Sequence, residues 1–317
     1  MNMTKTSHPF FDGLKTIPEG KHKELQKIRN WLLTQPHLPT ISDDFVYLFL
    51  HACYYDLTRT KYTIDRYFTI RSKTPMLFAN RDVDHPTIQT CIELAHVVRL
   101  PKLTPDGYKV LMYTCKDPDY TKLVFADAVK GFCMFNDCAL SEDGLAEGYI
   151  VLFDMKGVSL GHLARVSLPP LKAFLNYIQE AHPARLKQIH VLNTANYINH
   201  IMRIILPLVR SEFLSFVKFH KGNVPEGIPI EIMPKDYGGE APTVKELDEE
   251  SLSMVDKYRD WLKDSEKYQV DETKRIKKGS WWGGLFGYGQ QTIPNNNNMA
   301  LVVDGQQKVY LKDLQID

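Results

Sequence analysis

The stretch FDMKGVSLGHLARV, residues 153–166, joins an apolar run to a segment of helical character. Within it, Gly157, Ser159 and Gly161 spell G-x-S-x-G, the nucleophile elbow of α/β-hydrolases when it lies between a strand and a helix. The same residues suit a structural turn, because glycines let the chain bend and a serine caps the helix that follows. The stretch therefore predicts a strand, a turn and a helix, with a serine that is either a nucleophile or a cap.

A hydrolase would need an acidic residue and then a histidine after the serine. Between Ser159 and His220 the acidic residues are Glu180 and Glu212, and no HGGG-type segment for an oxyanion hole precedes the serine. The helical residues upstream also leave too few strands for a hydrolase sheet. We therefore predict that Ser159 caps a helix and that the chain has no catalytic residue. A serine esterase remains the less favoured alternative.

Short apolar runs rich in β-branched and aromatic residues alternate with helix-length segments. The runs YKVLMY, YIVLFD, QIHVLN and SFVKFH begin at residues 108, 149, 188 and 215. Helix-length segments follow the first three runs, over 120–140, 163–181 and 197–209. This alternation is typical of βαβ units, in which helices pack against a mainly parallel sheet. The predicted fold class of this region is α/β.

The residues on either side of this region have helical periodicity. Before it, helices are predicted over 18–33, after a cap at Ser42, over 56–72 and over 88–98. After it, one charged helix is predicted over 244–269, and the sequence ends in a hairpin at Asp304-Gly305. We expect three parts: a helical domain over 1–100, an α/β domain over 101–243, and a C-terminal helix with a folded-back extension over 244–317.

The composition narrows the possible functions. The net charge is +1 over 317 residues, which argues against a nucleic-acid partner. No metal-ligand spacing is present, so we expect no metal. The 5 cysteines form no CxxC pair, and neither a signal peptide nor a long apolar run is visible. The sequence therefore predicts a cytoplasmic protein with reduced thiols.

Four motifs follow one another along the chain: the helical stretch 49–78, FDMKG at 153–157, HPARLKQIH at 182–190 and MPKDYGG at 233–239. In this order they resemble the N-terminal helices, the F-D-x-x-G strand end, the F-P-x-K/R-x-x-x-I-H segment and the L-P-x-E-Y-G-G motif of CRAL-TRIO lipid-transfer proteins. The resemblance lies with the α-tocopherol transfer and retinaldehyde-binding branch, and the tail at 308–317 resembles that of insect members. It implies a helical N-terminal domain and a mixed sheet with an internal apolar cavity and a mobile gate helix.

The resemblance also implies a function, that of a non-enzymatic carrier which holds one hydrophobic ligand and exchanges it at membranes. Tocopherols, retinoids, carotenoids and similar terpenoids are candidate ligands, and no other cofactor is expected. Gly131 and Phe135 replace serines near the tocopherol hydroxyl group, which argues against tocopherol itself. For each residue implied to line the cavity, ordinary core packing is the alternative: Phe132, Phe135, Tyr149, Phe153, Leu160, Val166, Phe174, Tyr177, Ile178, Ile189 and Val191.

The implied gate helix covers residues 197–209. An apolar stripe that closes over a ligand can lie in the membrane interface when the gate opens, whereas a permanently packed helix is the alternative. Pro207 is expected to end or bend this helix. The gate helix begins at Tyr197, and the residues of its stripe are Ile198, Ile201, Ile204, Ile205 and Leu208.

The resemblance further implies a membrane surface with phosphoinositides as a partner. Two positions that are basic in the tocopherol branch carry Glu212 and Val217 here, so a solvated basic face is the alternative. An adaptor that reads phosphoinositides without exchangeable cargo is a second candidate function. The resemblance implies phosphate contacts at Arg185 and Lys187, and three further basic residues nearby are candidates to supply charge: Arg210, Lys218 and Lys221.

The patch KRIKKGSWWGGLFGYG, residues 274–289, combines cations with aromatic side chains. Interfacial membrane anchors have this composition, because the cations attract anionic headgroups and the aromatics enter the boundary. The candidate membrane contacts are Trp281, Trp282 and Phe286. The alternative is that these side chains pack back onto the α/β domain.

Overall fold

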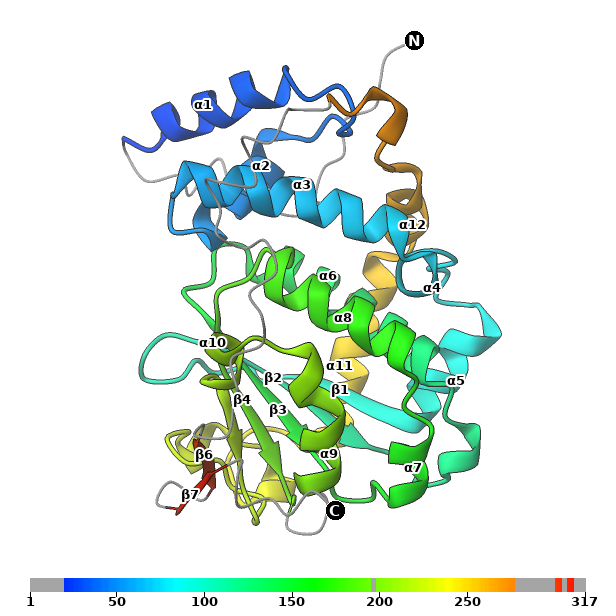
Figure 1. Cartoon of the computed structure of the whole chain (residues 1–317). Helices are drawn as coiled ribbons and strands as arrows, with labels where there is room; N and C mark the ends of the chain where they lie inside the picture. Colours follow the sequence, from blue (N-terminus) through cyan, green and yellow to red (C-terminus); the bar gives the residue numbers. More distant parts are fainter. Residues whose placement is uncertain (1–19, 195–197, 277–299, 304–306, 311–317) are drawn as a thin grey trace.

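The computed structural model describes residues 20–194, 198–276, 300–303 and 307–310 (Figure 1). Their elements form three layers: a sheet, a layer of helices on one face of it, and an outer group of N-terminal helices (Figure 1). No helix within these residues has both the length and the apolar content that crossing a membrane requires.

The sheet has seven strands in chain order, β1 to β7. β1 (Ala95–Arg99) is antiparallel to β2 (Lys109–Cys115), while β2, β3 (Tyr149–Asp154), β4 (Leu186–Leu192) and β5 (Val217–Phe219) are parallel. β5 meets β6 (Ala300–Val303) through one residue pair, and β6 is antiparallel to β7 (Gln307–Tyr310). The α/β class and the βαβ units are confirmed. β6 and β7 pair as the predicted terminal hairpin requires, and its turn at residues 304–306 lies outside the described residues.

The helices of the middle layer pack on one face of the sheet. They are α6 (Phe125–Asp143), α8 (Leu168–Glu180) and α9 (Ile198–Ile205). Short elements accompany them: η2 (Tyr120–Lys122), α7 (Leu160–Ala164), η3 (Leu206–Leu208) and α10 (Ser211–Leu214). The three predicted helical segments are therefore present, each divided into a long and a short element.

The outer layer consists of α1 (His22–Leu32), α2 (Asp43–Ala52), α3 (Leu57–Lys73) and α4 (Pro75–Phe78). Side-chain caps begin two of these helices: Ser42 accepts the N–H of Phe45, and Asp56 accepts those of Thr58 and Arg59. This layer packs on the side of α6 and α8 that faces away from the sheet, through residues such as Val129 and Ala173. The middle layer is thus covered on both sides.

The helix predicted over 88–98 is wrong from residue 95 onward. α5 covers Pro86–Leu94, and the next residue begins β1. Residues Ala95–Arg99 pair with β2 along their whole length, so tertiary pairing overrides the helical periodicity. A domain boundary at residue 100 would separate β1 from the rest of its sheet.

The single helix predicted over 244–269 is also wrong. α11 (Val244–Lys257) and α12 (Arg259–Asp264) are separated at Tyr258, whose φ of −99° and ψ of 7° leave helical geometry. Tyr258 is fully buried and its hydroxyl donates to Glu142 at 2.7 Å. The helix is therefore interrupted where this side chain turns into the core. Two shorter turns follow, η6 (Ser265–Lys267) and η7 (Glu272–Lys274).

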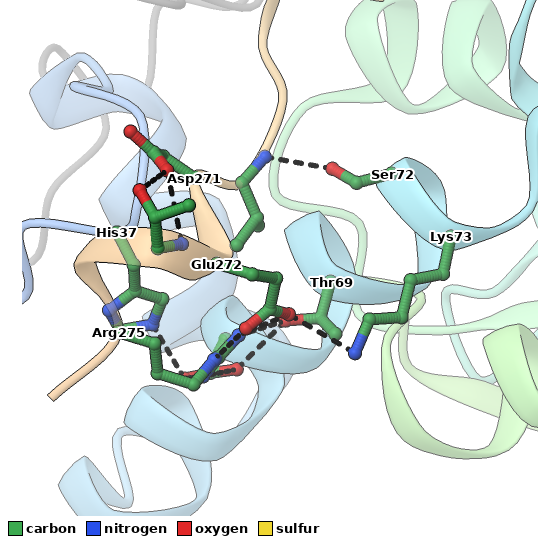
Figure 2. A network of polar contacts seen from close by, with 10 residues as sticks. His37, Thr69, Ser72, Lys73, Asp271, Glu272 and Arg275 are labelled. Carbon is green, nitrogen blue, oxygen red and sulfur yellow. Dashed lines mark hydrogen bonds and ion pairs between the residues drawn. The ribbon is translucent and has the colours of Figure 1, made fainter. Parts of the chain in front are cut away.

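Residues Val270–Arg275, which we call the C-terminal strap, return to α3 of the outer layer (Figure 2). The N–H of Val270 donates to Ser72 at 2.8 Å, and the guanidinium of Arg275 pairs with Asp65 at 2.8 Å. Glu272 pairs with Lys73 at 3.1 Å. Such partly exposed ion pairs stabilise a fold by up to about 1 kcal/mol each.

A buried ionic cluster joins the same parts of the chain more strongly. Asp137 of α6 pairs with Arg81 at 2.6 Å and with Arg71 at 2.9 Å, and Arg81 also donates to Ser265 at 2.8 Å. Burial alone would raise the pKa of Asp137, but the two arginines outweigh it and hold this pKa at about 2. The outer layer, α6 and the C-terminal residues are therefore linked through one carboxylate.

Candidate ligand-binding cavity

The G-x-S-x-G stretch forms the predicted turn between β3 and α7. Gly157 has φ of +86°, a conformation that favours glycine. A Cβ at Gly161 would lie 2.6 Å from the ring of Tyr120, so only glycine fits beneath that ring. Ser159 occupies the N-cap position of α7. The prediction of a strand, a turn and a helix with Ser159 as the cap is confirmed.

Two of the quoted motifs meet at the end of β3. Asp154 of FDMKG accepts hydrogen bonds from the N–H of Lys156 at 2.8 Å, from Asn193 at 2.6 Å and from the hydroxyl of Tyr237 in MPKDYGG. A Cβ at Gly239 would lie 1.9 Å from the carbonyl oxygen of Met233, which requires glycine there. The pairing of motifs 83 residues apart therefore has a structural role.

A cavity of about 360 Å³, which we call the large cavity, lies between α5, α6, α7 and the first three strands. Its volume falls within the range of about 300–1,000 Å³ typical of ligand pockets. Most of its wall is hydrocarbon, which favours an apolar ligand. Among the residues that line it are Ile88, Cys91 and Ile92 of α5, Val97 of β1, Phe125 and Phe135 of α6, and Leu252 and Val255 of α11.

A second cavity of about 80 Å³, the small cavity, lies between α6, α8, β3 and β4. Phe132 and Phe153 line both cavities. Their rings stack with centroids 6.0 Å apart, and the ring of Tyr113 lies 4.5 Å from that of Phe132 and 5.3 Å from that of Phe153. We call these three side chains the aromatic partition, because they lie where the two cavities adjoin.

The residues implied to line a cavity fall into three groups. Phe132, Phe135, Phe153 and Val166 line the large cavity, and Phe132, Phe153, Tyr149, Phe174, Ile178 and Ile189 line the small one. Leu160, Tyr177 and Val191 line neither of these two.

Each of these three exceptions has a clear location. Leu160 is 52% exposed on α7. Tyr177 belongs to the core shared with the outer helices, where its ring lies 4.8 Å from that of Phe78 and its hydroxyl accepts from Arg71 at 3.2 Å. Val191 is buried in the core between the sheet and the middle layer.

The contribution of α5 and β1 to the large cavity was missed from the sequence. Ile88, Cys91 and Ile92 are spaced i, i+3 and i+4 along α5 and so share one face. That spacing signals an apolar helix face, and it would have suggested a cavity wall if β1 had been recognised beside it.

Polar contacts surround His162, which lines the large cavity. The N–H of Ser159 donates to Nδ1 of His162 at 3.0 Å, and Oγ of Ser159 lies 3.0 Å from the same nitrogen. Burial lowers the pKa of this imidazole. Within the described part of the chain, no carboxylate forms a hydrogen bond with His162, so a serine–histidine pair is present without the acid that orients it in a triad.

Exposed apolar side chains flank the large cavity where β2 and β3 end. Tyr120, Val124 and Leu160, the apolar rim, are 44%, 55% and 52% exposed. They neighbour Leu123 and Leu163, which line the cavity. In α/β proteins ligands commonly bind at the carboxyl ends of parallel strands, as at this rim.

The implied gate helix is α9 followed by η3. Ile201, Ile204, Ile205 and Leu208 are half-buried against the core of the middle layer, and Arg203 is exposed on the other side. None of the described side chains of α9 lines the large or the small cavity. Tyr197 and the side chain of Ile198 lie outside the described residues.

The implied phosphate contacts separate into two places. The guanidinium of Arg185 lies 4.2 Å from the ring centroid of Tyr54, and Lys187 donates to the hydroxyl of Tyr54 at 3.0 Å. Arg185 also pairs with Glu147 at 2.8 Å and is buried, which leaves Lys187 as the more accessible cation of the two.

The other basic residues follow the length of β4 and β5. Arg210 donates to the carbonyl of Gln179 at 2.9 Å, beside the amino end of β4. Lys218 lies within β5, and Lys221 follows it at the carboxyl end. At about 3.3 Å per residue, a strand as long as β4 keeps its two ends roughly 20 Å apart. Trp281, Trp282 and Phe286 lie outside the described residues.

Comparison with known families gives two matches. Residues 95–239 match the model of the CRAL/TRIO domain, and residues 17–88 match that of a Pinta-like UBA domain.

Individual relatives are distant but extend over most of the chain. The alpha-tocopherol transfer protein-like protein of Mus musculus is 26% identical over 251 residues, which cover 76% of this chain and 71% of that protein. Clavesin-2 of Mus musculus is 21% identical over 271 residues, or 80% of this chain and 83% of that protein. The crystal structure of Sfh5 aligns with 67% of this chain and 81% of its own at 13% identity and a TM-score of 0.38.

Proposed function

Because this chain is a member of the CRAL/TRIO family, we propose that it is a carrier which binds one hydrophobic ligand in the large cavity and exchanges it at membranes. The observation that carries the proposal is the size of this cavity, about 360 Å³, together with its hydrocarbon wall. Water gains few hydrogen bonds beside such a wall, whereas an apolar ligand gains contact with its hydrocarbon side chains.

The proposed ligand is a retinoid, a carotenoid or another terpenoid. The name of the alpha-tocopherol transfer protein-like relative supports this class. Gly131 and Phe135 both line the large cavity and offer no hydroxyl group to a ligand, which argues against tocopherol. The aromatic partition limits the ligand to one cavity unless its rings turn.

Exchange at a membrane is supported by the apolar rim. Three exposed apolar side chains beside the residues that line a cavity can enter the lipid boundary while the ligand leaves. We propose that Lys187 contacts phosphoinositide phosphates, because it is the more accessible of the two cations beside Tyr54. A cytoplasmic carrier of this kind would contact membranes only transiently.

Native mass spectrometry of the purified protein, with organic extraction of whatever it releases, tests the proposal. The expected result is one lipid per chain, whose extraction names the ligand class. A chain that carries nothing and takes up no retinoid, carotenoid, tocopherol or phospholipid would overturn the carrier. Binding of phosphoinositide headgroups by such an empty chain would favour the adaptor instead.

Besides the G-x-S-x-G spelling, the distance of 3.0 Å between Oγ of Ser159 and Nδ1 of His162 favours an esterase. The backbone N–H of Ser159 competes for the same nitrogen. We therefore expect no hydrolysis of short-chain esters by the purified protein. Hydrolysis by the wild type that is lost in Ser159→Ala would support the esterase as the function of this chain.

A further inference from the structure

Apart from thiols and the phenol of Tyr113, whose hydroxyl accepts from Asn136 at 2.8 Å, three ionisable side chains line the large cavity: Asp117, Asp154 and His162. Asp154 accepts three hydrogen bonds at the end of β3. Asp117 accepts the N–H of Asp119 at 2.9 Å and pairs with Lys122 at 2.6 Å. Both carboxylates are thus engaged by the protein, whereas the imidazole of His162 has protein partners at Nδ1.

The hydrogen bonds of His162 determine which nitrogen can donate. Its Nδ1 accepts the N–H of Ser159, so the neutral ring carries its proton on Nε2. Burial lowers the pKa of this imidazole, which favours the neutral ring. Among the described residues none accepts a hydrogen bond from Nε2, and the ring of Tyr120 packs against the imidazole with centroids 6.0 Å apart. A donor at the cavity wall therefore lacks a partner within the described chain.

We propose that Nε2–H of His162 donates a hydrogen bond to an oxygen at one end of the ligand. This inference rests on the proposed carrier function and narrows its ligand to a long apolar molecule with one terminal hydroxyl, carbonyl or carboxylate oxygen. The rest of the wall is mostly hydrocarbon, so a second polar group on the ligand would lose its hydrogen bonds to water without replacement.

Ser159 has the role of a positioning residue. Its hydroxyl can either donate to Nδ1 or accept from it, but its backbone N–H can only donate. The backbone N–H is therefore the group that requires Nδ1 to be an acceptor. Replacing the imidazole of His162 should therefore abolish the preference for a ligand with a terminal oxygen.

The test compares two probes that differ in the terminal oxygen: the isoprenoid alcohol phytol and its hydrocarbon counterpart phytene. Dissociation constants are measured by native mass spectrometry of the full chain, after removal of any lipid that copurifies. One hydrogen bond of about 1.4 kcal/mol predicts that the wild type prefers phytol by about tenfold. His162→Phe should bind both probes about equally, and His22→Phe, the same change at an exposed histidine of α1 in the outer layer, should keep the wild-type preference.

A preference for phytol that is unchanged in His162→Phe would overturn the inference while leaving the carrier in place. Failure of all proteins to bind either probe would overturn the carrier itself. If His162→Phe does not fold, nitrogen-15 spectra of histidine in the wild type decide the matter. The inference requires an Nε2-protonated ring whose Nε2 resonance shifts with phytol and not with phytene, and a ring protonated at Nδ1 would refute it.

Discussion

The two faces of the sheet differ in how their side chains are packed. On the face turned away from α6, Met112 and Leu152 are fully buried and pack with Met233 and Leu247. On the face turned toward α6, Tyr113 and Phe153, the next residues along the same strands, line the large cavity. Because successive side chains of a strand point to opposite faces, each strand supplies both a close-packed core and a cavity wall.

Histidines on the two faces of the sheet also differ in their hydrogen-bond partners. His190 lies beside Leu152 on the close-packed face and is fully buried, with Nδ1 2.9 Å from Nε2 of His220 and Nε2 2.6 Å from Oε1 of Gln188. His162 on the cavity face has protein partners at Nδ1. Complete pairing suits a group that stabilises the fold, whereas an available donor suits a group that binds a ligand.

The largest difference between the faces is expected for stability. Leu152→Ala removes a fully buried side chain from the close-packed face and should lower the free energy of unfolding by about 2–5 kcal/mol. Leu163→Ala acts at the wall of an existing cavity and should cost less than about half as much, because fewer contacts are lost. Urea unfolding at neutral pH measures both, and equal losses would contradict the contrast.

The next effect concerns pH. Burial, together with the charges of His220 and Lys218, lowers the pKa of His190 to about 3 in the folded protein. Between a pH of about 6.5 and this value, His190 is therefore protonated in the unfolded chain and neutral in the folded one. The free energy of unfolding should therefore fall as the pH drops from about 6.5 toward 3, by at most about 1.4 kcal/mol per pH unit for this group.

His190→Gln should flatten this dependence more than His162→Gln does, because burial is complete only for His190. His51 and His182, both with pKa lowered to about 4, remain in either variant and retain part of the slope. Urea titrations at several pH values between 7 and 4.5 compare the slopes. Identical slopes in the two variants would show that the faces do not differ in this respect.

A smaller effect is expected from Gly131 in α6, which lines the large cavity. A Cβ there would meet Cys91 at 3.6 Å, an ordinary contact, and alanine is a better helix former than glycine. Gly131→Ala should therefore raise the free energy of unfolding by about 0.5–1 kcal/mol while reducing the cavity volume. Thermal unfolding together with ligand retention tests this, and a destabilised variant would mean that the cavity wall is already close-packed.

Patterns along the sequence predicted the sheet and the turn at Ser159 well, because strand alternation and capping are local properties. Residues 95–99 have a helical pattern yet form β1, because their pairing with β2 is decided by residues far along the chain. Tyr177 belongs to a helix that faces the sheet on one side and the outer layer on the other, and the sequence could not tell which side this residue takes. For the same reason Leu160 was assigned to a cavity although it is exposed beside one.

The smallest change in stability is expected at the apolar rim, where the cavity face meets solvent. Leu160→Asp should alter the free energy of unfolding by no more than about 0.5 kcal/mol, because the side chain is exposed and an acidic residue is favoured in the first turn of a helix. The same change should slow ligand transfer between vesicles several-fold, since a charge opposes entry into the lipid boundary. Leu103→Asp, at an exposed leucine beside the amino end of β2, is the matched control. If both variants slow transfer equally, the membrane contact is not confined to the rim; if neither does, exchange does not need it.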